Sequence, residues 1–197
     1  MKKAILKILD LIGRMLSYVY PRGLSGMLSS MRNRVYTGYL HRKFKYLGDD
    51  SVVCWHPYTL KGLDKVIIGD GTTVERDVQL TAFGGAITIG NGCLIRRGAH
   101  ITSVESITIG DGLLTGTNVL ITDNSHGNAD NLNLPPRERP VTGRGPVVIG
   151  KNVWLGNNVC VMPGVTIGDG AVIGANSIVT HDVPENSIAA GVPAKVK

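Results

Sequence analysis

The stretch VVIGKNVWLGNNVCVMPGVTIGDGAVIGANSIVT, residues 147–180, carries an aliphatic side chain at every sixth position. The members of this series are Ile149, Leu155, Val161, Ile167, Ile173 and Val179. An α-helix would return its apolar stripe about every 3.6 residues, so a period of six excludes a helix and favours short strands joined by sharp turns. Glycine, asparagine and aspartate stand between the aliphatic residues, and these residue types are typical of such turns.

The same signature, an aliphatic residue followed by any residue, Ile, Gly, any residue and Gly or Asn, occurs five times. The copies are VIIGDG (66–71), ITIGNG (87–92), ITIGDG (107–112), VVIGKN (147–152) and VTIGDG (165–170). Successive copies start 21, 20, 40 and 18 residues apart, which indicates an eighteen-residue coil with insertions. Three strands would make one triangular coil, with the aliphatic residues inside. Small residues would lie near its corners (Cys93, Ala99, Ala171 and Ser177). Stacked coils would pair strand on strand and bury one continuous core.

This pattern resembles the hexapeptide-repeat acyltransferases, whose fold is the left-handed parallel β-helix. The resemblance covers roughly residues 48–197 and is most specific in the last third of the chain. It implies an all-β solenoid acyltransferase domain over 48–197, preceded by a basic helical segment at 1–47. The left hand is an implication of the family alone, because the usual preference for right-handed crossovers favours the opposite hand.

A loop of nineteen residues, 127–145, interrupts a chain whose other turns are nearly all minimal. Long excursions from a repeat protein are typical of its binding face. Prolines stiffen this loop and arginines make it basic; they are Pro135, Pro136, Arg137, Arg139, Pro140 and Arg144. We therefore expect a protruding, partly rigid arm that reaches a neighbouring subunit.

His126 stands at the base of this arm, in the stretch NVLITDNSHG (118–127). That stretch resembles the motif in which sugar and xenobiotic O-acetyltransferases carry their general-base histidine, so the resemblance implies that His126 is catalytic. An imidazole that titrates near neutrality suits the removal of a proton from an attacking hydroxyl. From the residues alone, a structural histidine is the alternative. Asp123 either orients the ring, holds an acceptor hydroxyl or caps a turn.

Residues 149–197 are similar to the C-terminal signature of the family, in which coenzyme A lies in the groove between two prisms. The resemblance implies acetyl-CoA as donor and a homotrimer, with sites between neighbouring subunits. Carried over position by position, it places donor-binding residues at Trp154, Asn157, Ala175, Thr180 and Lys195. A backbone amide near Asn157 would stabilise the developing oxyanion. Lys195 would pair with a cofactor phosphate, unless the C-terminal tail is frayed.

The chain departs from the family at Arg96, where members that act on small sugars commonly carry Asn to hold the acceptor. The stretch IRRG (95–98) puts two arginines there. Arg96 is therefore a substrate-binding candidate that favours an anionic or larger acceptor over galactosides or maltose, unless both arginines are simply solvated. The histidines lack the close spacing of the β-helical carbonic anhydrases, so no metal site is expected.

Positive charge is concentrated in residues 1–47, which hold ten Lys or Arg and one acidic residue in a chain of net charge +6. Residues 2–20 place polar side chains on a narrow stripe of a largely apolar helix, ended by Pro21 and Gly23. This segment either caps the open first coil or makes peripheral contact with the inner membrane, and both can hold together. A nucleic-acid partner is not expected.

The location that we expect is the cytoplasm. No apolar run reaches the ~18 residues of a membrane span, and Lys7 and Asp10 interrupt the apolar start. Three widely spaced cysteines favour a reducing compartment and are expected to be small core residues; they are Cys54, Cys93 and Cys160.

Together, the residues and the resemblance predict a trimeric, acetyl-CoA-dependent O-acetyltransferase that acts on a sugar hydroxyl in surface polysaccharide synthesis. The nearest alternative is a xenobiotic acetyltransferase that inactivates an antibiotic hydroxyl. A different class is a non-catalytic β-helical scaffold that only organises partners. The acceptor itself, and O- versus N-acetylation, are not decided by the sequence.

Overall fold

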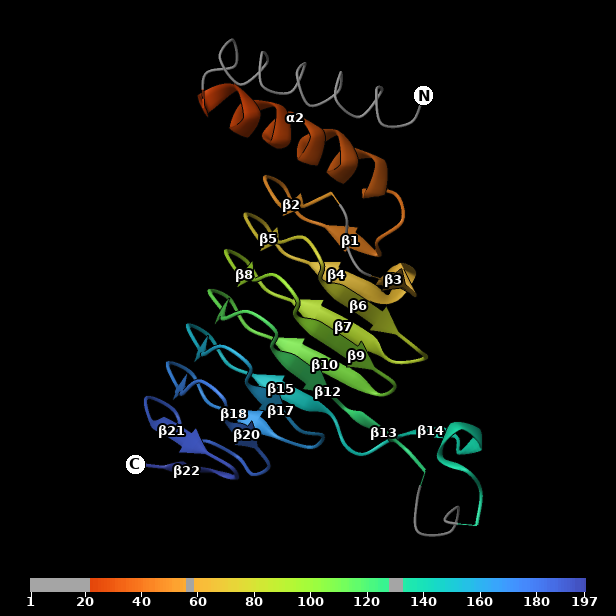
Figure 1. Cartoon of the computed structure of the whole chain (residues 1–197), viewed down its shortest axis with the longest axis vertical. Coiled ribbons are helices and arrows are strands. Elements are labelled where there is room, and N and C mark those ends of the chain that lie inside the picture. The colour runs from red at the N-terminus through yellow and green to blue at the C-terminus, as the bar shows by residue number, and fades with distance from the viewer. Residues whose placement is uncertain (1–21, 56–58, 128–132) are drawn as a thin grey trace, which may run out of the picture.

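The computed structural model describes residues 22–55, 59–127 and 133–197. In these ranges the chain forms one helix, α2 (Arg22–Leu40), followed by short strands stacked into a three-sided parallel β-helix (Figure 1). The chain visits the three sheets in turn, so each circuit adds one strand to each sheet. The all-β solenoid with an N-terminal helix is confirmed. The helix expected over residues 2–20 lies outside the described residues.

The three faces of the column are parallel sheets, here called A, B and C. Sheet A has the order β1 (Tyr46–Leu47), β4 (Val66–Ile68), β7 (Ala86–Ile89), β10 (Ser106–Ile109), β15 (Val147–Ile149) and β18 (Thr166–Ile167). Sheet B has the order β2 (Val52–Val53), β5 (Thr73–Val74), β8 (Leu94–Ile95), β11 (Leu114–Thr115), β16 (Trp154–Leu155), β19 (Val172–Ile173), β21 (Ile188–Gly191) and β22 (Ala194–Val196), the last of them antiparallel. Sheet C has the order β20 (Ile178–Val179), β17 (Cys160–Val161), β12 (Leu120–Thr122), β9 (His100–Ser103), β6 (Gln79–Ala82) and β3 (Thr59–Lys61).

Strand registers in sheet A reproduce the spacing read from the sequence. Ile67 pairs with Thr88, Ile87 with Ile107, Ile107 with Val147 and Val148 with Thr166. The predicted coil offsets are therefore confirmed, including the long excursion before β15. Insertions leave the stack intact because each one is confined to a corner between strands.

The interior of the column is one continuous core of mostly aliphatic side chains that all three sheets contribute. The six-residue series from Ile149 to Val179 is at most 1% exposed throughout. The predicted corner residues are buried as well; they are Cys93, Ala99, Ala171 and Ser177. The expectation that all three cysteines are core residues is wrong for two of them. Cys54 and Cys160 are only partly buried, because Cys160 faces outward on β17 and Cys54 lies at a corner after β2.

The corner between sheets A and B, here called the A–B edge, has two residue positions that stack from coil to coil. The first position is glycine in every coil from Gly48 to Gly168, and a Cβ on Gly90 would lie 2.7 Å from the Asp111 backbone nitrogen. The second position carries mostly Asp or Asn, whose Oδ1 accepts the backbone N–H of the coil before it. These bonds are Asp49 to Asp70, Asp70 to Asn91 and Asn91 to Asp111, each 2.8 Å, and Lys151 to Asp169, 2.7 Å. The A–B edge is thus closed by a side-chain ladder that is interrupted once, at Lys151, whose Nζ lies 3.5 Å from Asp111 Oδ2.

The helix α2 lies across the open first coil, at the end of the column opposite β21 and β22 (Figure 1). Leu40 and Phe44 are 3% and 6% exposed, and the Thr37 hydroxyl accepts the Val53 N–H at 3.0 Å. The helix therefore covers the apolar end of the column, as the capping explanation requires. Its outer face carries an exposed apolar stripe, formed by Met27, Met31, Val35 and Tyr39. Contact between residues 1–47 and a membrane stays a prediction.

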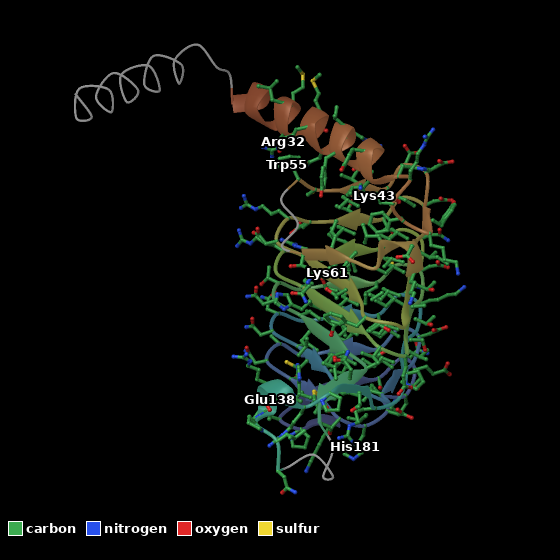
Figure 2. The ribbon with its side chains drawn as sticks, turned by 90° about the vertical axis from the view of Figure 1, so that its right-hand side faces the viewer. Arg32, Lys43, Trp55, Lys61, Glu138 and His181 are labelled. Atoms are coloured by element: carbon green, nitrogen blue, oxygen red, sulfur yellow. The ribbon has the colours of Figure 1, made fainter. Side chains whose placement is uncertain are left out.

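Within the described ranges, no helix has both the length and the apolar character that crossing a bilayer requires. The long excursion after β12 starts and ends as a two-stranded antiparallel ribbon, β13 (Asn124–His126) with β14 (Val141–Gly143). A short 3-10 turn, Pro136–Glu138, lies in its outer part. This arm protrudes from the corner between sheets C and A, towards the end of the column opposite α2 (Figures 1 and 2).

Candidate active site

His126 ends β13, where it pairs with Val141 across the ribbon. Its side chain is exposed and makes no hydrogen bond or ion pair with the described part of the chain. The backbone around it is firmly held. The Gly127 N–H donates to the Pro140 carbonyl at 2.9 Å, and the Arg144 guanidinium donates to the Gly127 carbonyl at 2.7 Å. The ring is therefore free to meet a substrate while its backbone is fixed.

Asp123 is fully buried at the corner between sheets C and A. Its carboxylate accepts hydrogen bonds from the Val104 and Glu105 backbone N–H groups, at 2.8 and 2.9 Å, and from the Ser103 hydroxyl at 2.8 Å. The structure gives it no hydrogen bond to His126. These contacts match the turn-capping alternative, because the carboxylate ties the turn at 103–105 to the base of the arm.

A pocket of about 260 Å³, here called the donor pocket, lies on the corner between sheets B and C, the B–C edge. Three of the predicted donor-binding residues converge there: Trp154, Asn157 and Ala175. Trp154 is 52% exposed and forms part of the pocket lining. The remaining lining includes three glycines that stack in register, Gly116, Gly156 and Gly174.

The donor pocket exists because the side chains that close the A–B edge are missing from this part of the B–C edge. Asn157 Oδ1 still accepts the Thr117 N–H, at 2.9 Å. The next coil offers Ala175, which has no acceptor, so the Asn157 N–H makes no hydrogen bond within the described residues. An amide that is unpaired within the described residues therefore lines a pocket in which three stacked glycines leave the backbone open to a ligand.

The remaining predicted donor residues lie outside the donor pocket lining. The Thr180 hydroxyl is exposed after β20 and lies 2.9 Å from His181 Nδ1. Lys195 is exposed on β22, where it pairs with Ala190. The strand around Lys195 is hydrogen-bonded to the last coil, since the Lys197 N–H donates to the Ile188 carbonyl at 2.9 Å.

Arg96 lines a second and larger pocket, of about 500 Å³, where α2 meets the B–C edge. Its Nε lies 3.3 Å from Glu75 Oε1. Arg97, the second arginine of IRRG, lines it too, whereas sequence reasoning missed two further arginines and an aromatic residue: Arg32, Arg76 and Trp55. Figure 2 shows Arg32 and Trp55 at the junction of α2 with the first coil. The adjacent arginines of IRRG were the one sequence signal that pointed here.

Arg32 and Arg76 act electrostatically on the thiol of Cys54, which lines the same pocket. Burial raises the pKa of the Cys54 thiol, and Glu75 raises it further, whereas Arg32 and Arg76 act to lower it. Across residues 22–55, 59–127 and 133–197, no group of three or more His, Cys, Asp or Glu side chains is placed to hold a metal ion.

Comparison with known proteins identifies the repeat. Residues 146–181 match the family described as "Bacterial transferase hexapeptide (six repeats)". WbbJ of Escherichia coli (strain K12), named as a lipopolysaccharide biosynthesis O-acetyl transferase, is 36% identical over 181 residues, 88% of each chain. Galactoside O-acetyltransferase of the same strain is 40% identical over 129 residues, which cover 66% of this chain and 61% of that enzyme.

Solved structures share the fold. The hexapeptide-repeat acetyltransferase VCA0836 from Vibrio cholerae is 28% identical with a TM-score of 0.57, over 89% of this chain and 88% of that one. AntD, an N-acyltransferase from Bacillus cereus solved with dTDP and 3-hydroxybutyryl-CoA, has a TM-score of 0.71 at 20% identity, over 82% and 86% of the two chains. At that identity the likeness concerns the fold alone.

A repeat column of this shape, matched along most of its length by named acetyltransferases, defines the class as a hexapeptide-repeat acyltransferase. The chain belongs to the bacterial hexapeptide-repeat acetyltransferase family, and it is an enzyme.

Proposed function

We propose that this enzyme transfers an acetyl group from acetyl-CoA to a hydroxyl of a sugar, in the synthesis of a cell-surface polysaccharide. The observation that carries the proposal is the exposed His126 ring, which makes no hydrogen bond or ion pair within the described residues and stands on a firmly held ribbon. The similarity to WbbJ, over 88% of each chain, supports the polysaccharide context. The similarity to galactoside O-acetyltransferase, 40% identical over 129 residues, supports acetyl transfer to a sugar.

The donor pocket fits an acyl-CoA. Its glycine floor lets a narrow pantetheine chain approach the backbone closely. Trp154 flanks the pocket with an apolar face, and the Asn157 N–H donates to the carbonyl oxygen on which negative charge develops. Acetyl-CoA, when bound, supplies an acetyl group activated as a thioester.

His126 acts as the general base. A neutral imidazole nitrogen accepts the proton of the acceptor hydroxyl as its oxygen attacks. The Arg144 contact to the Gly127 carbonyl, at 2.7 Å, holds the ribbon so that the ring keeps its position. Asp123 contributes indirectly, by fixing the corner from which the ribbon leaves the column.

The site is completed by a second copy of the chain, in a homotrimer. His126 follows sheet C at the C–A corner, whereas Trp154 and Asn157 belong to the B–C edge. One chain therefore carries its base and its donor pocket on different edges of the column. Threefold packing that sets the arm of one copy against the B–C edge of the next joins them.

The test is free-thiol release from acetyl-CoA with a panel of sugars, sugar nucleotides and chloramphenicol-like alcohols. His126→Ala should lower kcat/KM by about 10²–10⁴, because a general base is lost. The melting temperature of the protein should stay unchanged, because the His126 side chain is exposed. His41→Ala is the matched control, since His41 is exposed at the end of α2. Sedimentation should give a trimer for all three proteins. Full turnover by His126→Ala, or no turnover with any acceptor, would refute the proposal.

A further inference from the structure

The two pockets share one edge of the column. Sheet B registers extend through the corner, so the positions after β2, β5, β8, β11, β16 and β19 stack in two files. The first file is Cys54, Glu75, Arg96, Gly116, Gly156 and Gly174, and the second is Trp55, Arg76, Arg97, Thr117, Asn157 and Ala175. The edge is thus charged and bulky near α2 and bare over the last coils.

The charged end, here called the arginine pocket, has an excess of positive charge. Four arginines line it against the single carboxylate of Glu75. That carboxylate is already engaged, since Oε1 faces Arg96 Nε at 3.3 Å and Oε2 accepts the Arg97 N–H at 2.9 Å. The guanidinium group of Arg97 has no ion pair within the described residues. The pocket therefore presents unneutralised guanidinium groups to a ligand.

The helix α2 supplies the opposite wall. Among the residues that the structure describes, Arg32 is held only by a long contact to the Ser29 hydroxyl, 3.4 Å, so its guanidinium stays available. The Trp55 ring meets Tyr36 of α2 edge to face, with centroids 5.0 Å apart, and the backbone N–H of Trp55 donates to Asn33 Oδ1 at 3.0 Å. An aromatic ring that remains 40% exposed is thereby fixed at the rim.

The arginine pocket meets the donor pocket. Thr117 lines the first and its neighbour Gly116 lines the second. The Thr117 N–H donates to Asn157 Oδ1, so the boundary between the pockets is a single hydrogen-bonded step. A ligand held by the arginines would therefore extend its other end towards the donor pocket.

We propose that the arginine pocket binds the phosphate groups of the acceptor, which is a sugar diphosphate ester. This inference rests on the proposed function, whose acceptor class it names. Guanidinium forks match phosphate oxygens in geometry and charge, and such pairs are stronger than neutral hydrogen bonds. A cavity of about 500 Å³ is the size of a small-molecule site, and Trp55 offers a flat face for the sugar or the group beyond the phosphates.

Binding of inorganic pyrophosphate to the full chain, followed by calorimetry without acetyl-CoA, tests the pocket apart from turnover. Arg97→Gln and Arg32→Gln should each weaken binding about tenfold, because each removes one charge-assisted contact. Arg34→Gln is the matched control, since Arg34 lies on the same helix, pairs with Asp50 at 3.8 Å and is outside the pocket lining. The control should change binding less than about twofold.

Uridine diphosphate N-acetylglucosamine and farnesyl diphosphate distinguish the source of the phosphates. If uridine diphosphate N-acetylglucosamine binds more tightly than pyrophosphate, and Arg97→Gln loses this binding, the acceptor is nucleotide-linked. The same result with farnesyl diphosphate identifies a lipid-linked acceptor. If neither ester binds, or if all three variants behave alike, the proposal is overturned. Displacement of pyrophosphate by coenzyme A would also overturn it, because the arginines would then serve the donor.

The two proposals fail separately. Intact pyrophosphate binding with no thiol release from any acceptor would refute acetyl transfer but leave the phosphate site standing. Thiol release from neutral sugars alone, unchanged in Arg97→Gln, would uphold acetyl transfer and refute the phosphate site.

Discussion

The A–B and B–C edges of the column are both corners at which the backbone passes from one sheet to the next. The A–B edge is closed by side chains, whereas the B–C edge carries both pockets. At the A–B edge, glycine and then Asp or Asn recur, and the side-chain ladder takes up the backbone N–H groups of Asp49, Asp70, Asn91 and Lys151. The one Lys in the series, Lys151, offers no acceptor, but its long side chain lies over the corner with Nζ 3.5 Å from Asp111 Oδ2. At the B–C edge the ladder bond at Thr117 is followed by Ala175, whose short side chain leaves the Asn157 N–H without a hydrogen bond in the described part of the chain. The comparison teaches that a hexapeptide corner becomes a binding site when its acceptor side chains are withdrawn.

The largest effect on stability is expected at Asp123, a fully buried carboxylate that accepts backbone N–H groups as the ladder residues do. Asp123→Ala should lower the free energy of unfolding by about 3 kcal/mol, because the Val104 and Glu105 N–H groups and the buried Ser103 hydroxyl lose a fully buried charged acceptor. Chemical denaturation measures this. Asp123→Asn, which keeps one acceptor oxygen, should retain kcat within about tenfold. A loss of 10²-fold or more in the Asn variant, with little change in stability, would instead assign Asp123 to orienting the base.

Closing the B–C edge is the next test. Ala175→Asn should extend the ladder, because its Oδ1 can accept the Asn157 N–H as Asn157 accepts that of Thr117. We expect the KM for acetyl-CoA to rise about tenfold and the free energy of unfolding to rise by about 0.5–1.5 kcal/mol.

The mirror change, Asn91→Ala, opens the A–B edge at a bond of 2.8 Å. It should lower the melting temperature and leave the KM for acetyl-CoA unchanged. An unchanged KM in Ala175→Asn would show that the donor pocket has been assigned wrongly.

The smallest effect concerns the pH dependence of the A–B ladder. The Asn91 backbone N–H, with help from Lys151, holds the pKa of Asp111 below its ordinary value of 3.8. A depressed pKa in the folded state means that Asp111 contributes stability above pH 3.8 and loses it as the pH falls through the folded-state pKa. Between about pH 5 and pH 2, the melting temperature should therefore fall with decreasing pH slightly more steeply for the wild type than for Asp111→Asn. Identical slopes would mean that the ladder charge is irrelevant to stability.

Sequence reasoning reached the coil offsets and the buried series, and three of its predicted donor residues line one pocket, while their role in donor binding stays a prediction. Each of these depends on the local hexapeptide repeat or on a family motif within it. It did not place Thr180 and Lys195, which the resemblance assigned to the donor site and which lie outside the donor pocket lining. Their role in donor binding stays a prediction.

The arginine pocket was beyond the reach of the sequence for a different reason. Arg32 comes from α2, and nothing in the repeat says how that helix lies across the first coil. Arg97 and Arg76 are neighbours only because sheet B registers them 21 residues apart, through a corner with an insertion. The sequence indicated the adjacent arginines Arg96 and Arg97, but not that α2 lies opposite them across the pocket.

By itself the sequence determined the column: a side chain that recurs every sixth residue must face the same interior, whatever the rest of the chain does. Only the tertiary structure decided which corner residues gather into a pocket. Corner neighbours in successive coils are 18 to 40 residues apart, and their contacts depend on every insertion between them and on where α2 lies.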